Sequence, residues 1–116
     1  MSVTIYHNPR CSKSRQTLQI LQDKGIEPTV VEYLKTPLDK AALQNLLAQL
    51  GCSPREILRK GEEAYKENHL HDPNLTDDQL LNVLVAHPKL MERPVVVHGE
   101  RAVLGRPPES VLALFP

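Results

Sequence analysis

Apolar residues in the N-terminal third of the chain change their spacing twice. Residues 3–6 form a short β-favouring run, and the turn-forming sequence His7-Asn8-Pro9 follows it directly. Residues 12–25 place their leucines and isoleucine on one helical face and end in glycine, as helices commonly do. Residues 29–34 return to a β-favouring run. This pattern predicts a strand, a helix and a second strand joined by a right-handed crossover.

Helical spacing continues through the middle of the chain. Residues 37–51 are expected to form a helix that glycine ends. Ser53-Pro54 combines an N-cap residue with proline at the first helical position, which predicts a short helix ending near residues 59–61. Thr76-Asp77-Asp78-Gln79 has the spacing of a capping box and opens a further helix, which the pair His87-Pro88 ends.

Strand-like runs return near the C-terminus. Residues 94–98 and 102–104 favour β structure, and the Gly99-Glu100-Arg101 sequence between them suits a hairpin turn. These two strands should therefore be antiparallel. A proline pair then precedes a last helix over residues 109–114.

The order of these elements is typical of one fold class. A βαβ half, a helical segment and a ββα half indicate a thioredoxin- or glutaredoxin-like α/β domain with a four-stranded mixed sheet. The helical insertion would span about residues 37–88. No repeat or linker is visible, so we expect residues 1–116 to form a single domain, and a monomer.

Composition and charge exclude several functions. Lys plus Arg equals Asp plus Glu at 14 each, so no global field favours nucleic acid or a membrane surface. Three tyrosines and one phenylalanine are too few for a base-stacking platform. No apolar run approaches the roughly 20 residues that span a bilayer, and residues 1–6 have neither a charged region nor a long apolar stretch, so secretion is not expected. We therefore expect a cytoplasmic protein in which any anion site is built locally.

Cys11 is the best candidate for a reactive group. It follows a strand and a turn and lies at the first residues of a helix, where free backbone N–H groups and the helix dipole favour a thiolate. Lys13 and Arg15 add positive charge, and His7 is near enough in sequence to contribute a hydrogen bond. The alternative is a structural cysteine in a turn.

Ser14 stands where a dithiol oxidoreductase would carry its second cysteine. A mixed disulfide on Cys11 must therefore be resolved by Cys52 or by an external thiol, and the external thiol is the simpler solution. Two cysteines do not make a disulfide scaffold, which favours a reduced, cytosolic protein, although a disulfide between them stays an alternative. Cys52, at a helix junction, is expected to be buried and inert.

Three arginines stand at predicted element boundaries. Arg59 falls near a helix end, and Arg93 and Arg106 each precede a proline, which restricts the backbone around them. The planar guanidinium suits a tetrahedral oxyanion. Taken alone, an arginine of this kind is more often a solvated surface residue, and the convergence of the three on Cys11 does not follow from spacing.

Residues 7–15 resemble a known active-site segment. The sequence His-Asn-Pro-Arg-Cys-Ser-Lys-Ser-Arg is similar to the Asn-Pro-x-Cys-x-x-Ser-Arg motif of glutaredoxin-dependent arsenate reductases. The resemblance continues in order along nearly the whole chain, through residues 57–60, 76–80, 87–88, 93–97 and 105–107.

The resemblance implies a function and a set of roles. Cys11 would be the nucleophile that binds arsenate, and the family's histidine that lowers the thiol pKa falls on His7. The arginines that hold the oxyanion fall on Arg59, Arg93 and Arg106. Ser14, Arg15 and Pro94 complete the motif positions, and the bond before Pro94 would be cis. Glutathione would be the co-substrate and glutaredoxin the partner, with no metal and no bound organic cofactor.

Two other functions stay open. Spx-type transcriptional regulators share this fold and bind RNA polymerase, but their redox switch is Cys-x-x-Cys, whereas this chain has Ser14 after Cys11. The third hypothesis is a thiol oxidoreductase that acts on another substrate. The sequence His69-Leu70-His71-Asp72 has metal-binding residue types but no further ligand group, so a metal site is not expected.

Overall fold

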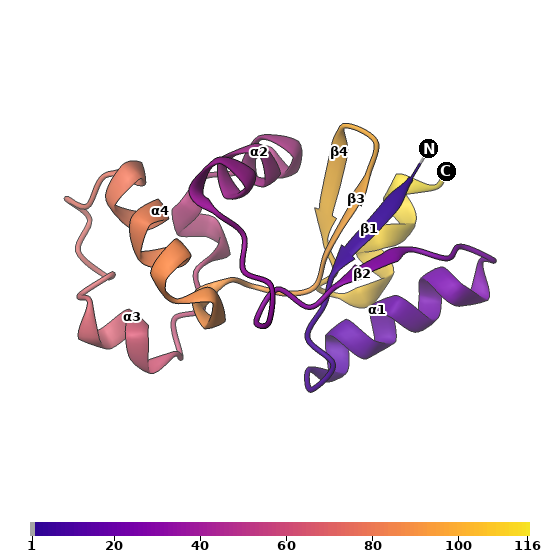
Figure 1. Cartoon of the computed structure of the whole chain (residues 1–116), viewed down its shortest axis with the longest axis horizontal. Helices are drawn as coiled ribbons and strands as arrows, with labels where there is room; N and C mark the ends of the chain where they lie inside the picture. The colour runs from indigo at the N-terminus through magenta and orange to yellow at the C-terminus, as the bar shows by residue number, and fades with distance from the viewer. Residues whose placement is uncertain (1) are drawn as a thin grey trace. The chain divides into compact units, whose positions relative to one another are not determined.

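The computed structural model describes residues 2–116, which form two compact units (Figure 1). One unit comprises the chain up to Thr36 together with Arg93–Pro116, and the other is Pro37–Glu92. The second unit corresponds to the helical insertion that the sequence predicts at about residues 37–88. No helix among residues 2–116 is both long and apolar enough to cross a bilayer.

The first unit is built on a mixed sheet. Within residues 2–116 the sheet has four strands in the order β2-β1-β3-β4, with β1 parallel to β2 and antiparallel to β3, and with β3 antiparallel to β4. Its elements are β1 (Val3–Tyr6), α1 (Ser12–Asp23), β2 (Thr29–Val31), β3 (Val95–His98), β4 (Arg101–Leu104) and the 3₁₀ helix η3 (Pro108–Leu114). This is a thioredoxin-like arrangement, and the predicted fold class is confirmed.

One face of the sheet carries the core of this unit. Alternate residues of β1 are buried there with Val96 of β3, as the period of a strand requires. Leu21 of α1 and Val111 of η3 close over them, and all three of Ile5, Leu21 and Val111 are fully buried. Burying each such side chain stabilises the fold by about 1.5–3 kcal/mol, which fixes α1 against the sheet.

The second unit is helical. It consists of α2 (Lys40–Leu50), the 3₁₀ helix η1 (Pro54–Ile57), α3 (Glu63–Glu67), α4 (Asp77–Ala86) and the 3₁₀ helix η2 (Pro88–Leu90). Leucines of α2 and α4 form its buried interior. The predicted capping box is confirmed, since Thr76 N–H donates to Gln79 Oε1 at 2.8 Å and Gln79 N–H donates to Thr76 Oγ1 at 3.2 Å. Gly51 ends α2 in the left-handed conformation, with a φ of 70°.

Several element ends differ from the prediction. β2 stops at Val31, three residues early, because the Glu32 carbonyl accepts hydrogen bonds from Lys35 and Thr36 and turns the chain. The helix expected to reach residues 59–61 is the single 3₁₀ segment η1, and α3 was not predicted. The last helix is also 3₁₀ and starts one residue earlier.

Gly105 lies where α1 approaches the end of β4. A Cβ at this position would lie 2.7 Å from Thr17 Oγ1 and 2.8 Å from Pro94 Cγ. The Gly105 N–H donates to the Pro94 carbonyl at 2.9 Å, and Thr17 is fully buried with its hydroxyl bonded to the Lys13 carbonyl. The missing side chain therefore lets the first turns of α1 pack closely against the start of β3.

Gly105→Ala is expected to destabilise the protein by about 1–3 kcal/mol, because the added methyl group overpacks a closed contact. Urea unfolding would measure the change in the free energy of unfolding. Gly61→Ala is the control, since a Cβ there meets nothing within 4 Å and its φ lies outside the left-handed region. Equal stability of Gly105→Ala and the parent would show that the contact is not tight.

Candidate active site

Cys11 is the N-cap residue of α1, as the sequence predicts. Its own N–H donates to the Asn8 carbonyl at 3.0 Å, and its carbonyl accepts from Arg15 N–H at 3.0 Å. The turn before the helix therefore closes on itself and fixes the backbone at the cysteine. The thiol is half-buried and free, beside N–H groups of the first helical turn that have no partner within the helix.

The surroundings of Cys11 favour its thiolate. Partial burial alone raises the pKa of the thiol, but the Ser14 N–H, the Arg93 side chain and the Lys13 N–H more than offset this. The pKa of Cys11 therefore lies below its ordinary value, and the thiolate is the nucleophilic form. Arg93 reaches the sulfur from the start of β3, a contact that the sequence spacing does not give.

His7 is held by Ser14 rather than by the sulfur. His7 Nδ1 lies 2.6 Å from Ser14 Oγ, which also accepts a hydrogen bond from Asn8 N–H at 3.0 Å. Burial lowers the pKa of His7, a nearby Glu32 carboxylate opposes this, and Arg15 lowers it further. The imidazole is thus neutral near neutral pH. A role of His7 in lowering the pKa of Cys11 therefore stays a prediction from the family resemblance.

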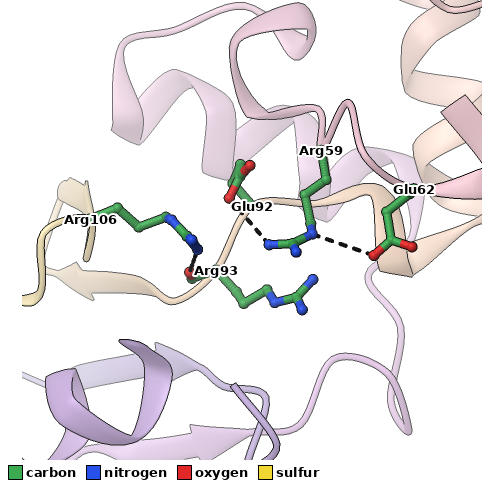
Figure 2. A network of polar contacts seen from close by, with 5 residues as sticks. All are labelled: Arg59, Glu62, Glu92, Arg93 and Arg106. Carbon is green, nitrogen blue, oxygen red and sulfur yellow. Dashed lines mark hydrogen bonds and ion pairs between the residues drawn. The ribbon is translucent and has the colours of Figure 1, made fainter. Parts of the chain in front are cut away.

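Two of the three arginines lie in the unit that carries Cys11. Arg93 and Arg106 each precede a cis proline, Pro94 and Pro107. The first cis bond was expected and the second was not. Arg106 Nη1 donates to the Arg93 carbonyl at 3.2 Å, so the two Arg–Pro segments are tied together at the ends of neighbouring strands (Figure 2).

Arg59 belongs to the unit Pro37–Glu92 and is paired there with carboxylates. Its Nε lies 3.4 Å from Glu62 Oε1, and its Nη1 lies 3.5 Å from Glu92 Oε2 (Figure 2). Neither partner was predicted from the sequence, since Glu92 is thirty-three positions from Arg59, and Arg59 and Glu62 lie between the helices η1 and α3. The convergence of Arg59 with the other two arginines stays a prediction.

Other residues shape the loop before Cys11. Arg15 Nη1 donates to the Pro9 carbonyl at 3.0 Å, and Asn8 Oδ1 accepts from Arg10 N–H at 3.0 Å. A cavity of about 210 Å³ adjoins this loop and is lined by His7, Asn8, Pro9, Arg10, Glu32, Leu34 and Lys35. Arg15 therefore stabilises the loop, in addition to any charge that it supplies.

Cys52 is free and half-buried like Cys11, not fully buried as expected, but its surroundings disfavour the thiolate. Burial raises the pKa of its thiol, and the Glu56 carboxylate raises it further by its charge and by a hydrogen bond. The thiol therefore stays protonated and unreactive near neutral pH. Across residues 2–116, no group of three or more His, Cys, Asp or Glu side chains is arranged to hold a metal ion.

The rate of Cys11 alkylation by iodoacetamide is expected to level off at a lower pH than for an ordinary thiol, whose pKa is about 8.5. Arg93→Ala should move that midpoint to higher pH, because the guanidinium no longer stabilises the thiolate. Arg101→Ala, an exposed arginine on β4, is the matched control. A parent rate that still climbs above pH 8.5, or an unchanged midpoint in Arg93→Ala, would contradict the lowered pKa.

The chain is similar to known proteins along most of its length. Residues 6–114 match the model of the ArsC family. The chain is 54% identical over 113 residues to the uncharacterised protein YfgD of Escherichia coli K12, covering 97% of this chain and 95% of that one. It is 46% identical over 115 residues to an arsenate reductase of Escherichia coli, covering 99% and 82%. An arsenate reductase structure from Vibrio cholerae matches with a TM-score of 0.96 and 50% identity, covering 99% and 98%.

Proposed function

This chain belongs to the ArsC family, and on that premise we propose that it reduces arsenate to arsenite with Cys11 as the nucleophile. The proposal is carried by Cys11 at the N-terminus of α1, where the Arg93 side chain lowers the pKa of the thiol. A guanidinium beside a thiolate lowers the electrostatic barrier for the approach of an anion. The same guanidinium can bind an oxygen of the arsenate while the sulfur attacks arsenic.

The arginines would neutralise the substrate. Arsenate is mostly a dianion at neutral pH, so a thiolate that approaches it meets repulsion. Arg93, Arg106 and Arg59 supply positive charge with a planar geometry that matches tetrahedral oxyanions, and the N-terminus of α1 adds its partial charge. Arg93 and Arg106 belong to the unit that carries Cys11, and a hydrogen bond joins their segments, so these two groups would stabilise the transition state with little reorganisation.

The reduction step needs two thiols, those of Cys11 and glutathione, and no metal. Cys11 Sγ attacks arsenic and a water or hydroxide leaves, so arsenic stays pentavalent in the adduct. A glutathione thiolate then attacks Sγ. The sulfur–sulfur bond forms as the sulfur–arsenic bond breaks, and the electron pair of the broken bond stays on arsenic, which leaves as arsenite. Glutaredoxin then takes glutathione from the mixed disulfide by thiol exchange and restores Cys11.

The remaining motif residues would hold this machinery in place. Ser14 and His7 fasten the loop through the hydrogen bonds at 2.6 and 3.0 Å, and Arg15 fastens it through the Pro9 carbonyl. Pro94 fixes the backbone that carries Arg93. We infer that the protein works in the cytoplasm, where glutathione keeps thiols reduced, and that a monomer without a bound cofactor suffices.

The proposal is tested with purified protein, arsenate, glutathione, glutaredoxin, glutathione reductase and NADPH. We expect NADPH oxidation that depends on arsenate and on this protein, with arsenite as the product. The control omits arsenate and should show no NADPH oxidation. A thiol oxidoreductase that acts on another substrate would oxidise NADPH only when that substrate is added. No arsenite above the protein-free background would contradict the proposal.

A further inference from the structure

Arg59 forms ion pairs with two carboxylates, one near it in the sequence and one distant. Glu62 follows it by three residues, and Glu92 comes from the far end of the same unit. The side chains of Arg59, Glu62 and Glu92 are only 25%, 29% and 24% exposed, so the group is more enclosed than an ordinary surface pair (Figure 2). Two negative charges thus face one guanidinium.

The backbone fixes one of these pairs. Arg59 N–H donates to the Leu90 carbonyl at 2.7 Å, and Glu92 N–H donates to the Ile57 carbonyl at 2.8 Å. Leu58 and Met91 form an antiparallel bridge between these bonds. Arg59 and Glu92 therefore lie on two backbone segments that these bonds join, so the placement of one segment beside the other does not depend on the two side chains. Glu92 also directly precedes Arg93 in the chain.

We propose that Glu62 and Glu92 are internal competitors of the oxyanion for Arg59 and that they weaken oxyanion binding. This inference rests on the proposed function, in which Arg59 contacts arsenate. An arginine that already faces two carboxylates offers less net positive charge to a dianion, and each carboxylate also repels that dianion. The two glutamates are then affinity-setting residues, which restrict the site to oxyanions that can displace them from the guanidinium.

Glu92→Gln separates charge from shape. The amide keeps an oxygen that can accept from Arg59 and keeps the backbone bond to Ile57, but it loses the negative charge. If Glu92 only positioned Arg59, this change would leave oxyanion binding unaltered or weaken it. If Glu92 competes, arsenate should bind about two- to fivefold more tightly, the range expected for one partly exposed ion pair. Glu62→Gln should act in the same direction.

Protection of Cys11 measures the binding without turnover. Arsenate is titrated in the absence of glutathione, and the rate of Cys11 alkylation by iodoacetamide gives the concentration for half-protection. Glu63→Gln is the matched control, because it removes one exposed carboxylate next to Glu62 with no ion pair to Arg59 among those of residues 2–116. Arg59→Ala and the double variant Arg59→Ala/Glu92→Gln complete a double-mutant cycle.

We expect Glu92→Gln to lower the half-protection concentration, Glu63→Gln to leave it unchanged, and the gain to shrink or vanish when Arg59 is alanine. Parent-like protection in Glu92→Gln, weaker protection, or an undiminished gain in the Arg59→Ala background would overturn this inference alone, with arsenate binding by the parent intact. No protection in the parent or in any variant would instead overturn the proposed oxyanion site together with it.

Discussion

Cys11→Ser is expected to abolish arsenate reduction in the glutaredoxin-coupled assay. A serine hydroxyl is not ionised near neutral pH, and it cannot form the disulfide that supplies the two electrons. Cys52→Ser should retain most of the activity, because burial and Glu56 raise the pKa of that thiol and keep it protonated. Each variant replaces one thiol sulfur with a hydroxyl oxygen, so the two variants are matched controls for each other.

The pattern of the two losses is diagnostic. Activity retained in Cys52→Ser and lost in Cys11→Ser supports a single nucleophile resolved by an external thiol. Loss of activity in both variants would indicate that Cys11 and Cys52 form an intramolecular disulfide during the reaction. The external-thiol mechanism would then be wrong, even with arsenate as the substrate.

Alanine at each of the three arginines should lower kcat/KM for arsenate by about one to two decades. A hydrogen bond to a charged group contributes about 1.5–3 kcal/mol, and 1.4 kcal/mol corresponds to about one decade in rate. Arg93→Ala should have the largest effect, because this side chain also lowers the pKa of Cys11. Steady-state kinetics at several arsenate concentrations would measure each loss.

Two sets of control variants show whether the loss of activity comes from the guanidinium geometry rather than from the lost charge alone. Arg→Lys at the same positions keeps the charge but loses the planar fork, and should recover only part of the activity. Arg101→Ala removes an exposed arginine of β4 and should behave like the parent. Thermal unfolding would verify that the variants are folded. Parent-like kinetics in all three alanine variants would contradict an oxyanion site built from these residues.

The parts of the site that depend on local structure could be predicted from the sequence. Cys11 lies at a helix N-terminus because a turn at residues 7–9 precedes α1. Neighbouring residues alone are enough to predict this position. The capping box at Thr76 is equally local. The family resemblance pointed to Arg93, but its contact with the sulfur depends on how β3 pairs with β1, which spacing does not reveal.

Hydrogen bonds and ion pairs that residue spacing does not reveal account for what was missed. Ser14 and His7 meet because the turn between β1 and α1 closes on itself, and burial lowers the pKa of the imidazole. Glu92 meets Arg59 through the Leu58–Met91 bridge, which joins segments over thirty positions apart. β2 ends early because of hydrogen bonds to the Glu32 carbonyl, which compete with strand propensity.

A single-turnover experiment read by intact mass tests the mechanism most directly. Reduced protein is mixed with arsenate and glutathione in the absence of glutaredoxin, and peptide mapping then locates any modification. We expect a glutathione adduct on Cys11, an unmodified Cys52, and one arsenite formed for each modified protein. A Cys11–Cys52 disulfide, or arsenite formed while Cys11 stays unmodified, would contradict it.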